Sequence, residues 1–248
     1  MKSNWKALII ALSATVICLG LIFAVQLLVN DWSFLAPATC WPECFYETVQ
    51  DGFMRQPWNT ISSLAFFTVG VYILCLPYQK AGKPILDARS SKLTRSILAI
   101  AAMITGLGSV FLHMSLSFIG QTFDVLGMYL ISMFLILYAF RGNLSLKKFL
   151  LLYVLGGLLL LIILIFIPDL RRWLFALLMV VGLVIEYYRH RKNYQTKLLF
   201  ASAGTLAFAF MFWILDSLRL LPHGHVLWHI LGAAALGVLF AYYTKEKP

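Results

Sequence analysis

Residues 148–167 read KFLLLYVLGGLLLLIILIFI, and only the first of these twenty residues is charged. A helix of about this length spans the hydrocarbon core of a bilayer. Comparable apolar stretches, separated by short polar segments, recur along the whole 248-residue chain. They predict transmembrane helices at 7–29, 58–77, 94–114, 119–140, 148–167, 171–188, 198–216 and 225–243. The expected fold class is therefore all-α, a polytopic transmembrane helix bundle.

The composition supports a membrane-embedded protein. Hydrophobic residues make up 61% of the chain and charged residues 12%, whereas soluble domains average about 25% charged residues. The net charge of +10 does not indicate a nucleic-acid partner, because the basic residues lie in short runs between apolar stretches rather than along one face. That distribution is typical of the positive-inside rule.

The same basic residues predict the orientation. With eight helices and the N-terminus inside, sixteen of the twenty lysines and arginines fall in cytoplasmic segments and four in outer segments. Both termini are thus expected in the cytoplasm. The first apolar stretch could instead be a signal peptide; its length and the proline at position 37 favour an uncleaved helix.

Three segments follow from this organisation. We expect an extra N-terminal transmembrane helix at 1–30, an outer cap loop at 31–56 and a seven-helix catalytic bundle at 57–248. Cys40 and Cys44 lie in the cap loop at C-x3-C spacing, where either a short-loop disulfide or two free thiols would fit. Cys18 and Cys75 lie in apolar stretches and are expected to pack as small hydrophobes.

Histidines gather at the predicted outer ends of the helices. His113 ends the third predicted helix, and His225 and His229 lie four residues apart at the start of the last, so that they share a face. His223 belongs to the same group. Ionisable groups inside a membrane are costly and usually mark function, and three imidazoles plus water is a common catalytic zinc site. His190, in a basic inner loop, is expected to be solvated.

Further polar residues lie at the same expected depth. Ser109 shares a helix face with His113, and Gly120 and Gln121 are expected to turn the chain so that Asp124 returns to the level of His113. Asp216 closes the seventh helix, where it either orients a histidine from behind or faces water.

Other features favour structural roles. Pro57 is expected to begin a helix whose polar residues Asn59, Thr60 and Ser62 bond neighbouring helices or line the cavity. Trp213 and Trp228 are expected to be interfacial anchors. Glu186, at the predicted inner interface, needs no special role.

Several motifs together resemble those of alkaline ceramidases. Residues 108–113 (GSVFLH) and 120–124 (GQTFD) are similar to that family's S-x3-H and G-Q-x2-D element, and residues 225–231 (HVLWHIL) to its H-x2-W-H-I-L motif. Residues 58–64 (WNTISSL) and 213–216 (WILD) resemble two more of its motifs. The likeness covers roughly residues 40–243. The wider superfamily of seven-helix membrane hydrolases includes adiponectin-type receptors and GPI-remodelling lipases, and the short loops suggest a bacterial-type member.

The resemblance implies a seven-helix hydrolase core, to which this chain adds one N-terminal helix. It implies a zinc ion held by His113, His225 and His229, with Ser109 and Asp124 beside the metal-activated water that cleaves the amide of ceramide or a related long-chain lipid amide. The substrate would reach a site on the outer face of the membrane.

The family's calcium site is not expected here. Trp41 and Glu43 match that stretch, but Cys40, Phe45 and Gln56 stand where the family has oxygen-rich or acidic ligands. Glu47 and Asp51 would replace them only through a rearranged loop.

Three other functions stay open. The same scaffold could act as a lipid esterase or phospholipase, since the motifs do not separate amides from esters. A receptor-like protein would hold a structural zinc with four protein ligands. A transporter would show an inverted repeat with broken helices, and the sequence shows no such internal symmetry. Nothing in the sequence indicates the oligomeric state.

Overall fold

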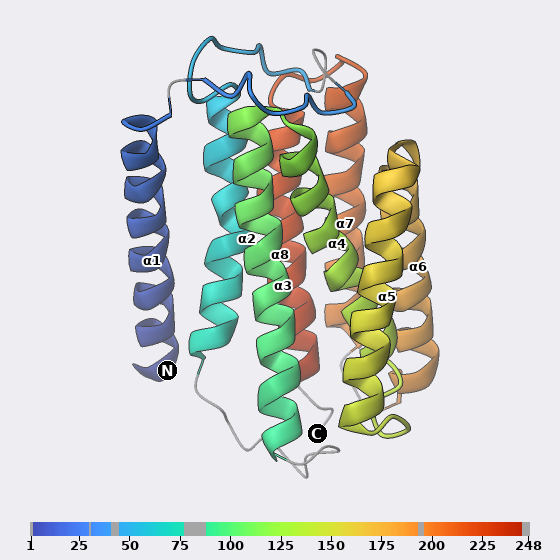
Figure 1. Ribbon diagram of the computed structural model, residues 1–248. Helices are drawn as coiled ribbons and strands as arrows, with labels where there is room; N and C mark the ends of the chain where they lie inside the picture. The colour runs from blue at the N-terminus through green and yellow to red at the C-terminus, as the bar shows by residue number, and fades with distance from the viewer. Residues whose placement is uncertain (1, 30, 41–44, 77–87, 193–195, 245–248) are drawn as a thin grey trace.

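The computed structural model describes residues 2–29, 31–40, 45–76, 88–192 and 196–244, and within them the chain is all-α (Figure 1). This confirms the predicted fold class and the number of helices. The helices are α1 Lys2–Gln26, α2 Pro57–Cys75, α3 Ala88–Ser115, α4 Phe118–Tyr138, α5 Leu146–Phe166, α6 Arg171–His190, α7 Thr196–Ser217 and α8 Gly224–Thr244, with a 3₁₀ turn, η1 Pro168–Leu170, before α6.

The boundaries differ most from the prediction where a helix continues beyond its apolar part. α1 begins five residues before the expected position and α3 six residues before it, because hydropathy marks the apolar part of a helix and not its solvated ends. Pro57 is at the first turn of α2, as expected, and Ser117 and Ser145 cap α4 and α5 by accepting backbone N–H bonds.

Seven of the described helices are long and apolar enough to cross a membrane. The chain is thus a multi-pass integral membrane protein. The remaining helix, α6, has the length of a span but is not one of these seven. It begins with Arg171 and Arg172 and carries Glu186 and Arg189 near its other end, which lowers its hydropathy relative to its neighbours.

Six helices form a ring, in the order α2, α3, α4, α6, α7 and α8 (Figure 1). α5 packs outside this ring against α4, and α1 packs outside it against α2. The contact between α6 and α7 is the weakest in the ring, although these helices follow each other in the chain. The ring is therefore loosest on the α6–α7 side.

Glycines bring α3 and α4 into backbone contact. A Cβ on Gly108 would lie 2.6 Å from the backbone nitrogen of Asp124, and one on Gly127 would lie 2.5 Å from the Cα of Thr105. Such close approach needs small residues, as is common between membrane helices. The α3–α4 pair is therefore a tightly packed unit that fixes the height of Asp124 against α3.

The extra helix α1 docks on α2 through a narrow face. Ala7 and Ala11 are buried there, and the hydroxyl oxygens of Thr15 and Thr68 lie 2.7 Å apart. The rest of α1 presents large apolar side chains such as Trp5 and Ile17 to the surroundings. A lipid-facing surface is the expected position for such residues in a membrane protein.

The described parts of the loop between α1 and α2 cross the upper end of the bundle as drawn in Figure 1. The loop pairs with the α3–α4 turn, because Ala38 N–H donates to Leu116 O and Phe118 N–H donates to Ala36 O, both at 2.8 Å. The expected turn at Gly120 and Gln121 was wrong. The turn lies at Leu116, which has a left-handed φ of 46°, and Gln121 is already in α4, where its Oε1 accepts a bond from Thr39 N–H.

At the opposite, lower end a buried ion pair joins the turn after α4 to α6 and α8. Arg141 donates two bonds of 2.7 Å to the Glu186 carboxylate, and Tyr242 donates a third of 2.9 Å to it. The expectation that Glu186 needs no special role was wrong. His190 was also misjudged, since it is buried and its Nε2 lies 2.9 Å from Ala139 O.

Candidate metal centre

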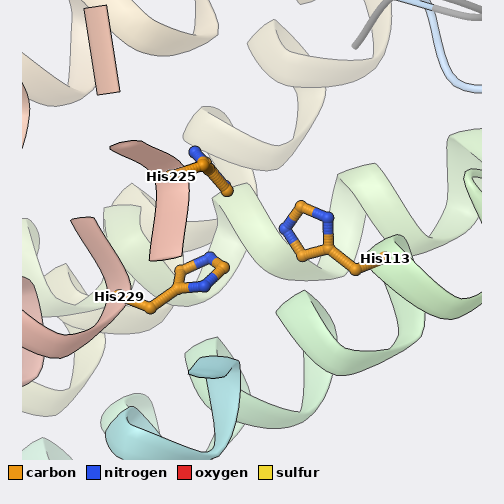
Figure 2. Close-up of side chains that lie close together, drawn as sticks. All are labelled: His113, His225 and His229. Atoms are coloured by element: carbon orange, nitrogen blue, oxygen red, sulfur yellow. The ribbon is translucent and has the colours of Figure 1, made fainter. Parts of the chain in front are cut away.

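Three histidines lie together at the upper end of the bundle (Figure 2). His113 comes from the last turn of α3, and His225 and His229 from the first two turns of α8. Each offers one ring nitrogen, and these three nitrogens lie within 4.8 Å of one another. All three side chains are at most 2% exposed.

The nitrogens fit a metal ion. Three nitrogens at zinc-bond length and tetrahedral angles are about 3.3 Å apart, so small side-chain rotations would close this group around one ion. Nε2 of His113 and both ring nitrogens of His225 are buried without a hydrogen-bond partner among the described residues. Since buried polar atoms are normally paired, these orphaned nitrogens suit an ion. No fourth histidine, cysteine or acid joins the group within the described parts of the chain.

Ser109 lies next to this group, one turn before His113 on α3. Its Oγ is 3.2 Å from Nε2 of His229 and 3.0 Å from Oγ of Ser63 on α2. Asp124, from the second turn of α4, interacts with the Ser109 hydroxyl. Ser109 therefore lies between the Asp124 carboxylate and His229.

Asp216 is buried, so the expected alternative of a water-facing carboxylate was wrong. It also does not touch a histidine ring in the way expected of an orienting residue. Its two oxygens instead accept backbone bonds from His225 N–H at 3.0 Å and Tyr46 N–H at 2.9 Å. It thus binds the start of α8 and the loop before α2 to the end of α7.

Three consecutive residues of that loop cover the histidines. The Phe45 ring lies 4.0 Å from the ring of His225 and 4.8 Å from that of His113, measured between centroids. Tyr46 is fixed by Asp216. The Glu47 carboxylate accepts the N–H groups of Trp58 and Asn59, both at 2.8 Å, at the start of α2. Burial raises the pKa of Glu47, and these two N–H donors oppose that rise. We call residues 45–47 the strap.

Trp41, Glu43 and Cys44 lie outside the described residues. Cys40 is disulfide-bonded, whereas Cys18 and Cys75 are free thiols. Phe45 and Gln56, which stand where the family's calcium ligands are expected, contact the histidines instead.

Several neighbours of the histidines differ from the expectation. His223 is exposed and lies apart from the cluster. Trp213 and Trp228 are not interfacial anchors but are buried and stacked, with ring centroids 4.8 Å apart.

Sequence reasoning missed the role of Gln56, whereas the expectation that Ser62 bonds a neighbouring helix agrees with its contact with His229 of α8. Oε1 of Gln56 is 2.8 Å from Nδ1 of His113, and Oγ of Ser62 is 2.8 Å from Nδ1 of His229. Both flank the start of α2, and the only available signal was the polarity of that helix start within an apolar chain.

Comparison with known protein families gives a match to the ceramidase model over residues 53–246. The chain belongs to the ceramidase family. No curated protein was found to match it. The family match covers α2 to α8 and begins within the loop, so that α1 lies outside it. The resemblance read from the motifs is confirmed, and membership makes this ceramidase-family protein a membrane-embedded lipid hydrolase of a metal-dependent family.

An apolar pocket lies inside the ring of this ceramidase-family protein. On α8 its lining runs from Trp228 to Leu239, beginning beside His229 and continuing about 15 Å down the helix. Phe175 of α6 and Leu206 of α7 line the side where the ring is loosest. The hydroxyls in its wall, Thr105 and Ser202, both donate to backbone carbonyls, so the wall offers only apolar contacts.

Proposed function

We propose that this protein is a zinc-dependent amidase that cleaves the amide of ceramide or a related long-chain lipid amide. One observation carries the proposal, namely that a chain of the ceramidase family has a buried group of three histidines, with an apolar pocket whose lining includes Trp228, the residue before His229. A polar reacting group and an apolar tail are the two parts of such a substrate.

His113, His225 and His229 would hold the metal. Three protein donors with one open position are typical of a catalytic zinc, whereas a structural zinc has four protein ligands. The described residues supply three donors, which favours an enzyme over a receptor with structural zinc. When bound, zinc lowers the pKa of a water ligand towards about 7 and polarises a carbonyl.

Ser109 and Asp124 would handle the proton and the developing charge. Asp124 interacts with Ser109 beside His229, so its carboxylate would take a proton from the attacking water and return it to the leaving amine. The Ser109 hydroxyl, one turn before His113, is placed to donate to the carbonyl oxygen as negative charge grows on it.

The cavity would hold the acyl chain. Its wall presents Phe66, Met128, Phe175 and Leu239 but no unpaired hydroxyl among the lining residues. A hydrocarbon chain gains about 0.8 kcal/mol for each CH₂ removed from water. For a lipid already in the bilayer this gain is smaller, and the cavity then mainly selects shape. The weak contact between α6 and α7 favours entry of the tail from the membrane on that side.

The distribution of basic residues supports an orientation with the histidine end of the bundle at the outer face of the membrane and both termini in the cytoplasm. The enzyme would therefore draw its substrate from the outer leaflet.

The test is purification in detergent with metal analysis, followed by incubation with a panel of ceramides, the corresponding fatty-acid esters and phospholipids. The proposal expects about one zinc per chain and release of fatty acid from ceramides. Release from esters or phospholipids alone would establish the esterase alternative. Bound zinc without turnover of any panel member would favour the receptor-like alternative.

A further inference from the structure

Two histidines of the candidate metal centre contact Gln56 and Ser62, polar residues at the start of α2. We propose that Gln56 and Ser62 are positioning residues that keep His113 and His229 in the Nδ1–H tautomer, so that both rings present a bare Nε2 to the metal. This inference rests on the proposed function, because it concerns how the rings receive zinc.

The orientation of Gln56 follows from its other contacts. Its side chain is fully buried, and its Nε2 donates to Glu47 O at 3.2 Å. The amide oxygen must then face His113, whose Nδ1 lies 2.8 Å away. The reversed amide would bring two oxygens together at Glu47. Since an amide oxygen only accepts, Nδ1 of His113 carries the hydrogen.

The same logic applies to Ser62. Its hydroxyl has one hydrogen, which it donates to Asn59 O at 3.1 Å. The Ser62 oxygen is therefore free to accept from Nδ1 of His229 at 2.8 Å. The neighbouring Ser63 also lies close to this ring, with its Oγ 2.7 Å from Asn59 O, 3.0 Å from Ser109 Oγ and 3.4 Å from the same Nδ1.

Both bonds leave the opposite nitrogen for the ion. Nε2 of His113 has no partner among the described residues, and Nε2 of His229 lies near the Ser109 hydroxyl. His225 has no partner of this kind on either ring nitrogen in the described part of the chain. Residues at the start of α2 thus hydrogen-bond one histidine ring from α3 and one from α8. These bonds orient two of the three metal-ligating nitrogens before any metal binds.

Hydrogen bonds to the second nitrogen of a ligating histidine fix its tautomer and orientation, and their loss typically costs about 10–100-fold in metal affinity. We therefore expect Ser62→Ala and Gln56→Leu each to weaken zinc binding by about tenfold or more. Ser62→Thr keeps the hydroxyl, so this variant should restore most of the affinity.

The experiment measures zinc affinity of the full-length protein in detergent by competition with a chelator. Ser132→Ala is the matched control, because Ser132 is a buried serine that donates to Met128 O within its own helix. Its affinity should equal that of the unchanged protein. Equal affinity of Ser62→Ala, Gln56→Leu and the control would overturn the proposal.

A second measurement reads the tautomer directly. ¹⁵N NMR of the metal-free protein, labelled at histidine, should show a protonated Nδ1 and a bare Nε2 for His113 and His229, and Ser62→Ala should shift His229 towards the other tautomer. A bare Nδ1 on these two rings in the unchanged protein would refute the inference. A protein that shows the expected tautomers but binds no zinc would instead refute the proposed function.

Discussion

The ring of Phe45 lies 4.0 Å from the ring of His225, with the two planes tilted by 35°. A residue of the loop before α2 therefore forms one wall of a group of histidines that α3 and α8 supply. Bulk water does not reach the three rings from above, since they are at most 2% exposed.

The histidine group is expected to hold about one zinc per chain, and the double variant His225→Ala, His229→Ala should hold almost none, because one imidazole alone cannot retain the ion. Metal analysis of the purified proteins measures this. His190→Ala is the control, since that buried histidine lies at the other end of the bundle and should leave the zinc content unchanged. Full occupancy in the double variant would contradict the assignment.

Asp124→Asn should lower turnover about a hundredfold or more, because the amide cannot accept a proton. The variant should keep its zinc, since Asp124 is not one of the three clustered donors. The measurements are the turnover rate of the variant on the best substrate of the panel and its zinc content. Near-normal turnover of a zinc-loaded variant would remove Asp124 from the mechanism.

Phe45→Ala should make zinc leave the protein faster, on the order of tenfold, because the apolar cover that limits solvent access is lost. The measurement is the rate of zinc transfer to an excess of chelator. Phe34→Ala removes a ring from the same loop that is 71% exposed and should leave that rate unchanged. Identical rates for both variants would show that the strap does not shield the site.

Glu186→Gln should lower the thermal stability in detergent markedly, because it leaves Arg141 buried without its anionic partner. Breaking a buried pair costs about 3–5 kcal/mol, which corresponds to roughly 10 °C in a domain of this size. Replacing both residues, as in Arg141→Met with Glu186→Leu, should cost less. Asp31→Asn is the control, since the Asp31 side chain that pairs with Arg55 is 52% exposed and its loss should matter little.

The loop between α1 and α2 is expected on the outer side of the membrane. Its side decides which leaflet supplies lipids to the histidine site. In a chain with Cys18 and Cys75 replaced, and after reduction of the Cys40 disulfide, a membrane-impermeant thiol reagent should label intact cells. Labelling that requires broken membranes would reverse the orientation and place the site at the cytoplasmic leaflet.

The helices were predictable from sequence because a membrane span needs a long apolar run, as residues 148–167 illustrate. The pairs of helices that pack together were not predictable, because hydropathy does not say which helix faces meet. Tryptophan is common at membrane interfaces, which is why Trp213 and Trp228 were expected there, yet the two rings stack inside the helix ring. Arg141 and Glu186 are 45 residues apart, and no sequence pattern indicates that they form an ion pair.

At the candidate site, spacing was enough to place Ser109 with His113 and His225 with His229, since residues four apart share a helix face. The motifs did not reveal which residues hydrogen-bond the histidine rings or which residue packs against them. Gln56 and Ser62 became visible only through their distances to Nδ1 of His113 and His229, and Phe45 only through the path of the loop. Their roles depend on tertiary contacts that no local pattern records.

The separation of the histidines along the chain has a consequence for biosynthesis. His113 leaves the ribosome with α3, whereas His225 and His229 belong to α8, more than a hundred residues later in the chain. The group cannot assemble until α8 has entered the membrane beside α2. A nascent chain that has not yet reached α8 therefore lacks two of the three histidines, so the order of synthesis delays assembly of the site until the helix ring can close.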